Sequence, residues 1–252
     1  MSEAVQIGHT TTLFEVPISR LDLASAVEEC ASVIAGGRGG YACFVNVHSL
    51  TEATREPALR ESLRRATYCF ADGMPLIWLS RGRGEPIAGR AAGPDFMTAL
   101  IERTRDRRHG LVGGEGLGER IAATYALDAV TYAPPRRAFS RDHAIADWHA
   151  FRGRCAGELP RIVWVGLGAP KQEQWMAAVE PHAPGVMFFG VGAAFDVLAG
   201  TQQRAPQWMR TRGLEWLYRL AKEPRRLVGR YALSNTRFLS RALLDQLFGT
   251  KK

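Results

Sequence analysis

The sequence lacks paired cysteines, long hydrophobic runs and a signal-like start, and each absence excludes a class of protein. Its four cysteines, Cys30, Cys43, Cys69 and Cys155, have no paired spacing, which excludes a zinc knuckle and a disulfide framework and fits a reducing cytosol. The most apolar stretch, Val186 to Phe195, is far shorter than the ~20 residues of a membrane span. The first ten residues lack the basic and apolar regions of a signal peptide, so we expect none.

Two common nucleotide-binding patterns are also missing. The chain has no Asp-x-Asp pair, so the usual carboxylate clamp for a divalent cation on a nucleotide diphosphate is absent and we expect no metal site. A soluble Rossmann oxidoreductase should carry Gly-x-Gly-x-x-Gly after its first strand and an acidic residue ~20 positions later. The first core strand ends in Asn46-Val-His48 instead. A Rossmann enzyme with a dinucleotide cofactor is therefore a weaker alternative, and we expect no cofactor.

Basic residues are concentrated at the C-terminal end of the chain. Residues 201–252 hold twelve Lys and Arg against three Asp and Glu, a formal charge of +9, whereas residues 1–200 carry −1. We therefore expect a globular domain over residues 1–200 and a basic, amphipathic helical appendage over residues 201–252 that meets an anionic partner. We place separate helices at about 205–212, at 214–222 and at 236–248, with a further segment opened by Pro224. Their composition is typical of a membrane-surface element. The alternative is helices docked on the domain with solvated arginines.

Short apolar segments that end in glycine or polar residues alternate with helical segments along the chain. An extended piece at 11–16, read as a hairpin, precedes them. We expect core strands at Tyr41–Val47, Tyr68–Ala71, from Leu111, at Ala129–Tyr132, Ile162–Val165 and Val186–Val191. This alternation indicates an α/β fold, a Rossmann-like three-layer sandwich with a mostly parallel sheet. In such sheets ligands bind at the carboxyl ends of the strands.

The strand Ile162–Val165 runs into a turn and then a helix, and the chain is organised around this junction. Gly166 and Gly168 allow a tight turn with close backbone approach, and Pro170 suits the first helical position. The first helical turn, where free backbone N–H groups favour an anion, then holds Lys171, Gln172 and Glu173. An ordinary helix start with surface polar residues is the alternative.

Polar residues also follow the two earlier strands. Asn46 and His48 stand at the end of the first, beside a helix that we expect to open with the capping box Ser49-Leu-Thr-Glu52. A ligand role for Asn46 and a hydrogen bond within the turn remain equally open. The second strand ends in Asp72-Gly73, which fits either a catalytic carboxylate or a turn-forming aspartate.

Two glycine-rich segments follow. The segment 81–93 is a loop with Arg81, Arg83 and Arg90, and its length and charge favour function over structure. Pro94-Asp95 is expected to cap the next helix. The turn at 113–118 is similar to a phosphate-cradling loop, a weak signal by itself.

Four segments resemble the TagA/WecG/CpsF-type bacterial glycosyltransferases, also called family 26. They are Phe70–Leu79 (FADGMPLIWL), Gly89–Asp95 (GRAAGPD), Val165–Trp175 (VGLGAPKQEQW) and Gly190–Tyr231, which begins GVGAAFDVLAGTQQRAPQWMRTRGLEW. The resemblance covers about residues 41–238, and its last two motifs are long and specific.

The resemblance implies a hexosyltransferase that moves a sugar from a UDP-sugar to a polyprenyl-diphosphate-linked saccharide, with inversion and without metal or cofactor. It implies a role in the synthesis of teichoic acid linkage units, common antigen or exopolysaccharide. The enzyme would lie in the cytoplasm, peripherally bound to the anionic inner face of the cytoplasmic membrane, with an appendage that completes the site. The sugar, the acceptor and the oligomeric state are left open, a homo-oligomer included.

The resemblance also suggests roles for particular residues. Asp72 matches the acid of the family's Ala-Asp-Gly motif and is the candidate base, although a positioning role stays open. Gln172 matches the glutamine of Lys-Gln-Glu, and Asn46 an asparagine preceded two positions earlier by threonine in many members, where this chain has Phe44. The cations expected to meet the charge on departing UDP are Arg90, Lys171, Arg219, Arg225, Arg226 and Arg230.

A nucleic-acid-binding protein that uses the arginine-rich C-terminus is the remaining alternative, since its charge would permit such binding. The near-neutral body and the glycine-turn sheet offer no groove-reading element. We therefore expect no nucleic-acid partner.

Overall fold

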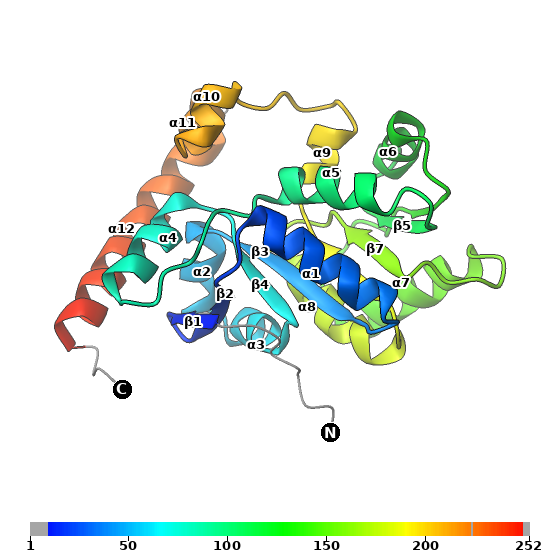
Figure 1. Cartoon of the computed structure of the whole chain (residues 1–252), viewed down its shortest axis with the longest axis horizontal. Helices are drawn as coiled ribbons and strands as arrows, with labels where there is room; N and C mark the ends of the chain where they lie inside the picture. The colour runs from blue at the N-terminus through cyan, green and yellow to red at the C-terminus, as the bar shows by residue number, and fades with distance from the viewer. Residues whose placement is uncertain (1–9, 223, 249–252) are drawn as a thin grey trace.

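The computed structural model describes residues 10–222 and 224–248 (Figure 1). Its strands are β1 Thr10–Leu13, β2 Val16–Ser19, β3 Gly40–Val45, β4 Tyr68–Ala71, β5 His109–Val112, β6 Ala129–Tyr132, β7 Ile162–Val165 and β8 Met187–Gly190. Its α-helices are α1 Leu23–Ala35, α2 Val47–Ala53, α3 Pro57–Arg65, α4 Met74–Gly82, α5 Gly93–Arg103, α6 Leu117–Tyr125, α7 Arg141–Gly153, α8 Lys171–Val179, α9 Ala194–Leu198, α10 Gln207–Thr211, α11 Glu215–Lys222 and α12 Pro224–Phe248.

Six strands form one parallel sheet in the order β4-β3-β8-β7-β5-β6. Every residue of β3, β4, β5, β7 and β8 is buried, because helices cover both faces of the sheet and the strands are mostly apolar. Only the edge strand β6 is partly exposed. The expected Rossmann-like three-layer sandwich is confirmed.

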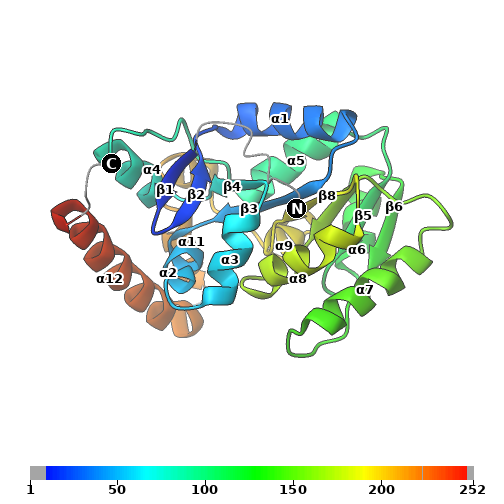
Figure 2. The same cartoon turned by 90° about the horizontal axis from the view of Figure 1, so that it is seen from below.

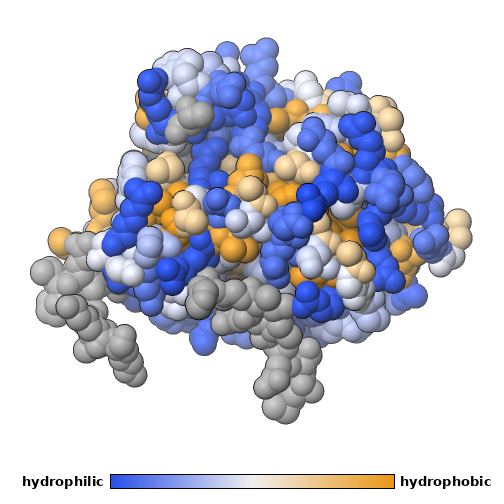
Figure 3. Space-filling view, viewed as in Figure 1, coloured by the Kyte–Doolittle hydropathy of each residue, from blue (hydrophilic) through white to orange (hydrophobic). Residues whose placement is uncertain are grey.

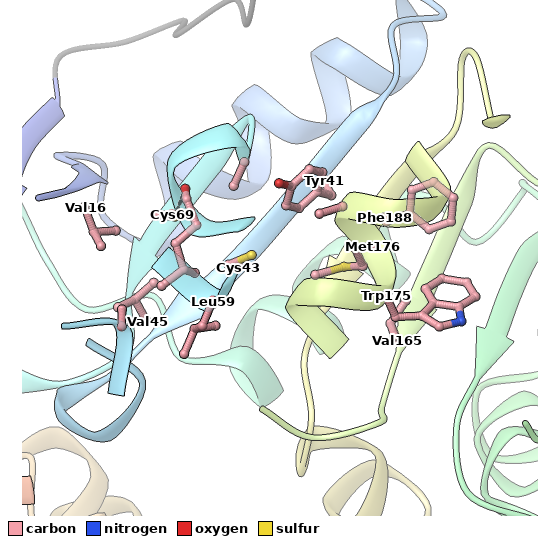
Figure 4. Packing of buried hydrophobic residues seen from close by; sticks show 14 of the residues in the cluster. Val16, Tyr41, Cys43, Val45, Leu59, Cys69, Val165, Trp175, Met176 and Phe188 are labelled. Carbon is pink, nitrogen blue, oxygen red and sulfur yellow. Dashed lines mark hydrogen bonds between the residues drawn. The ribbon is translucent and has the colours of Figure 1, made fainter. Parts of the chain in front are cut away.

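Alternate residues of each strand face two separate helical layers (Figures 1 and 2). One layer consists of α1, α5, α6 and α9, and its core is aromatic around Phe44, Phe96 and Phe189. The other consists of α2, α3, α4, α7 and α8, where Trp175 of α8 packs edge-on against Phe188 of β8 (Figure 4). The buried apolar side chains of both layers fix the register of the sheet.

The chain leaves neighbouring strands toward opposite layers. After β3 it enters α2 on one face, whereas after the adjacent β8 it enters α9 on the other. Between β7 and β5 the same divergence occurs, toward α8 and α6. Such divergence creates a crevice outside the carboxyl ends of the strands, which is where ligands of this fold class bind.

The C-terminal helix is longer than the sequence predicted. We expected a separate segment after Pro224 and a last helix from about Thr236, but α12 is one helix of 25 residues. Gly229 does not break it, because an internal glycine costs only about 1 kcal/mol and docking on the domain compensates that cost. Phe238 packs on Phe14, in the turn of the β1–β2 hairpin, with ring centroids 5.5 Å apart. That hairpin confirms the extended piece expected at 11–16. Among the described residues, no helix is long and apolar enough to cross a membrane.

Candidate active site

Asn46 and Asp72 stand next to each other at the carboxyl edge of the sheet. Val45 pairs with Ala71 in the parallel register of β3 and β4, and the Asp72 N–H donates to the Val45 carbonyl at 2.8 Å. The two residues that follow these strands are therefore fixed as neighbours by backbone pairing, independently of their side chains.

Asn46 is the N-cap of α2, which begins at Val47. Its Oδ1 accepts from the Ser49 N–H at 3.1 Å, and Ser49 Oγ accepts from the Asn46 N–H at 3.0 Å. The capping box thus starts at Asn46, and the box expected at Ser49–Glu52 is wrong. The physical reason is that Asn46 is extended (φ −116°, ψ 179°) and is a strong cap itself, so the helix begins three residues earlier.

His48 lies on α2 rather than at the strand end. Its Nδ1 is 3.1 Å from Ser234 Oγ on α12, so this side chain contacts the C-terminal helix. Thr51 Oγ1 lies 3.5 Å from the Ser234 carbonyl on the same helix. The structure therefore places His48 in the contact between α2 and α12.

Asp72 is half-buried, and two other segments converge on its strand end. The Ala91 N–H donates to the Ala71 carbonyl at 2.9 Å, which brings Arg90 to this edge. Gly213, in the turn between α10 and α11, packs on Met74 so closely that a Cβ there would lie 2.5 Å from Met74 Cγ. The turn between α10 and α11 therefore contacts Met74, which follows Asp72 by two positions in the chain.

Arg90 belongs to a cluster of five charged side chains that join α5 to the C-terminal helices. Its Nη2 lies 3.2 Å from Glu215 Oε2 and 3.8 Å from Asp95 Oδ2. Asp95 also accepts from Arg204 and Arg210. Burial alone would raise the pKa of Asp95, but the arginines, Arg204 first, hold it below its usual range. The sequence identified Arg90 but treated Asp95 only as a cap. The partners of Asp95 and Arg90 in the C-terminal segment lie 109–125 residues away in the chain, so no local sequence pattern indicates these contacts.

The first turn of α8 is largely buried, which contradicts the alternative of an ordinary helix start with surface polar residues. Gln172 Nε2 donates to the Gly190 carbonyl and to Glu173 Oε1, both at 2.9 Å. Gln172 therefore links the start of α8 to the end of β8, beside the crevice. Within the described part of the chain, Gln172 Oε1 and Glu173 Oε2 are buried without a hydrogen-bond partner. Such buried polar atoms are uncommon and mark this corner as a candidate ligand contact.

Lys171, at the same helix start, reaches away from β8. Its Nζ donates to the Arg137 carbonyl at 3.3 Å, in the loop between β6 and α7. The Arg137 guanidinium is itself bound to the buried Asp147 at 2.6 Å. Lys171 thus joins α8 to the β6–α7 loop rather than to the edge that carries Asp72.

The predicted C-terminal arginines are only partly described. Arg225 is exposed in the first turn of α12. The side chains of Arg219, Arg226 and Arg230 lie outside the described residues, so their predicted role stays a prediction. Arg204 and Arg210, which the sequence-based prediction omitted, are the described C-terminal arginines that reach the domain at this edge.

Two glycines at strand ends, Gly113 and Gly166, leave space that the side chain of Phe195 fills, so this space does not accommodate a ligand. A Cβ on Gly166 would lie 2.5 Å from two ring carbons of Phe195, and one on Gly113 would lie 2.6 Å from two. The close approach expected at Gly166 is therefore made by the buried Phe195 of α9. Gly168, with φ +77°, supplies the turn that the sequence predicted.

We expect Gly166→Ala to lower the free energy of unfolding by about 1–3 kcal/mol, because the new methyl group would displace a fully buried ring. Urea denaturation measures this change. Gly153→Ala is the matched control, since no atom lies within 4 Å of its Cβ position and its φ is not positive. Equal stabilities of the two variants would contradict the packing of Phe195 described above.

Glu173 gives a second stability prediction. Burial raises its pKa to about 7, above the ~4.3 of an unfolded chain. Its contribution to stability is therefore complete below pH ~4.3 and is lost as the pH rises through about 7. Glu173→Gln removes this loss, so at pH 8 the variant should be more stable than the natural protein by roughly 3–4 kcal/mol.

The measurement is urea unfolding at pH 4 and at pH 8. The gain from Glu173→Gln should be confined to pH 8, and the exposed Glu61→Gln should show no gain at either pH. A Glu173→Gln variant less stable at pH 8 than at pH 4, relative to the natural protein, would show that Glu173 is ionised and stabilising.

Fold and site together define a protein of the Rossmann-like class, with polar residues at the carboxyl ends of several strands. The chain belongs to the glycosyl transferase WecG/TagA/CpsF family, whose model matches residues 11–252. The match extends beyond the residues that carried the resemblance and includes the β1–β2 hairpin and α12. The protein is thus a glycosyltransferase of cell-surface polysaccharide synthesis, a family that uses a sugar donor and a lipid-linked acceptor. Among the described residues, no three His, Cys, Asp or Glu side chains are grouped as metal ligands.

Proposed function

We propose that this glycosyltransferase moves a hexose or N-acetylhexosamine-type sugar from a UDP-sugar to a polyprenyl-diphosphate-linked saccharide, with inversion and without a metal ion. The observation that carries the proposal is the convergence of Asn46, Asp72, Arg90 and the α10–α11 turn on one strand end. A carboxylate, a polar amide and a set of arginines meet there at the edge where this fold binds ligands.

In the proposed reaction Asp72 is the general base. Its carboxylate takes the proton from the acceptor hydroxyl while that oxygen attacks the anomeric carbon, and the bond to the UDP oxygen breaks on the opposite face. One direct displacement inverts the configuration. Asp72 suits this role because it stands at the end of a buried strand whose backbone pairing holds it in place.

The charge that builds on departing UDP needs cations, and the sequence offers no Asp-x-Asp pair to hold a metal there. We assign this role to Arg90, to the start of α8 with Lys171 and Gln172, and to the arginines of residues 201–252. Guanidinium groups bind phosphate oxygens in pairs, and a helix N-terminus adds free N–H groups. Gln172 Oε1, buried without a partner among the described residues, is available to accept a hydrogen bond from the donor.

We also propose that residues 201–252 form an appendage that brings the enzyme to the inner face of the cytoplasmic membrane. Val228, Leu239 and Leu243 of α12 are more than half exposed, and Arg225 is exposed on the same helix. Apolar and basic side chains together suit an anionic lipid surface, where each basic residue contributes on the order of 1 kcal/mol. The docked faces of α10–α12 remain on the domain, so the membrane-facing and solvated-helix interpretations of the sequence are compatible.

The test is UDP release by the purified full-length protein across a panel of UDP-sugars, with a short-chain lipid-diphosphate-sugar acceptor and EDTA. Acceptor-dependent release with one donor is expected. Release that disappears with EDTA would contradict the metal-free mechanism. Absence of release with every donor, together with failure of labelled UDP to crosslink, would contradict the proposed donor class.

A further inference from the structure

In the charged cluster between α5 and the C-terminal helices, each of the two parts supplies both acidic and basic side chains. The domain supplies Asp95 and Arg90, and the C-terminal segment supplies Arg204, Arg210 and Glu215. Asp95 of the domain binds Arg204 and Arg210 of the C-terminal segment, and Glu215 of the C-terminal segment binds Arg90 of the domain. The domain pair is neutral by itself and the C-terminal set carries a net charge of +1, and the ion pairs between them can form only when the two parts are apposed.

Asp95 is the centre of this cluster. Its two oxygens accept from the two terminal nitrogens of Arg204 at 2.6 and 3.0 Å, a fork geometry that fixes the guanidinium plane. Arg210 Nη1 adds a third contact to Oδ1 at 3.2 Å. Asp95 also stands in the first turn of α5, where the helix dipole favours a negative charge. A single carboxylate therefore holds two arginines from the C-terminal segment.

The cluster differs from the surface ion pairs of the same helix. The side chains of Arg90 and Arg204 are 15% and 17% exposed, whereas Arg103 and Glu28, paired at the other end of α5, are 51% and 64% exposed. Exposed pairs contribute little because water screens them, but breaking a largely buried one leaves charges without partners. We therefore expect that loss of the Asp95 contacts has a measurable effect on the protein and that loss of the Glu28 contact has little effect.

We propose that Asp95 is a positioning residue, which holds α10 and α11 over the strand end of Asp72 through its forked contact with Arg204. Two observations connect the cluster to the site. Arg90 binds Glu215 of α11 and adjoins Ala91, which pairs with Ala71 of β4. Gly213, between Arg210 and Glu215, packs on Met74. Figure 1 shows α10 and α11 apart from α9, after the connecting segment, and Figure 3 shows the same side of the molecule in space-filling form, so side-chain contacts with the domain help to set the position of these helices.

The experiment compares full-length Asp95→Asn, Arg204→Lys and Asp95→Glu with the control Glu28→Gln. Hydrogen exchange is followed at the amides of α10, of α11 and of the turn between them, such as Leu214 N–H, which donates to the Met209 carbonyl at 2.8 Å. Asp95→Asn should speed exchange there by about tenfold or more and leave α7 and α8 unchanged. Arg204→Lys should do the same, because lysine keeps the charge but loses the fork. Asp95→Glu should restore part of the protection, and Glu28→Gln should match the natural protein.

The consequence for activity rests on the proposed function: Asp95→Asn should lower turnover by about tenfold or more at an unchanged folded fraction. Unchanged exchange in α10 and α11 of Asp95→Asn would overturn the inference, as would equally faster exchange throughout the chain, the mark of a merely structural role. If the natural protein releases no UDP with any donor, the proposed function fails, while the exchange result still decides whether Asp95 positions the helices.

Discussion

Asp72→Asn is expected to lower turnover by about 10²- to 10⁴-fold, the usual contribution of a general base. Asparagine has nearly the same shape as aspartate but cannot take the proton from the acceptor hydroxyl. The backbone bond from Asp72 to Val45 does not involve the side chain, so the fold should persist. The rate of UDP release at saturating donor and acceptor measures the effect.

Asp142→Asn provides the matched control, since Asp142 is exposed in the first turn of α7, far along the chain from the crevice. It should leave turnover unchanged. If Asp72 acts as the base, the acid limb of the pH–rate profile should disappear in Asp72→Asn. A loss of less than tenfold with that limb intact would show that Asp72 only positions substrate.

Truncation after Gly200 should abolish transfer to a lipid-linked acceptor while leaving a folded body. It removes α10–α12, and with them Arg204, Arg210 and Glu215 of the charged cluster and the Gly213 turn on Met74. The strand end of Asp72 then loses its cover and most of its cations. UDP release with the lipid acceptor measures transfer, and circular dichroism with urea unfolding measures the fold.

The truncated chain also exposes Phe14, which Phe238 covers in the full protein, so some loss of stability is expected. Asp95→Asn in the full chain separates that loss from the effect on catalysis, because it keeps α12 in place. Full activity of the truncated protein with the lipid acceptor would contradict both the appendage and its role in the site.

The sequence by itself determined the layered fold and the place of the reacting edge. The buried strands are almost entirely apolar, with His109 of β5 as a polar member, and hydrophobic burial with short connections favours their parallel packing between helices. Asp72 was found because a carboxylate directly after such a strand must stand at its carboxyl end. The basic C-terminal fifth was equally visible, since charge is a property of composition.

Only the tertiary structure decided which polar residues are buried and which charges meet. The sequence placed Glu173 only in the first turn of a helix, whereas packing of α8 against the sheet removes it from water and raises its pKa. Asp95 gains its arginines from residues more than a hundred positions away. Packing between distant segments also places Phe195 against Gly166 and allows α12 to continue through Gly229. In each case the deciding free energy comes from contacts and desolvation between distant segments, which a local pattern of residues does not contain.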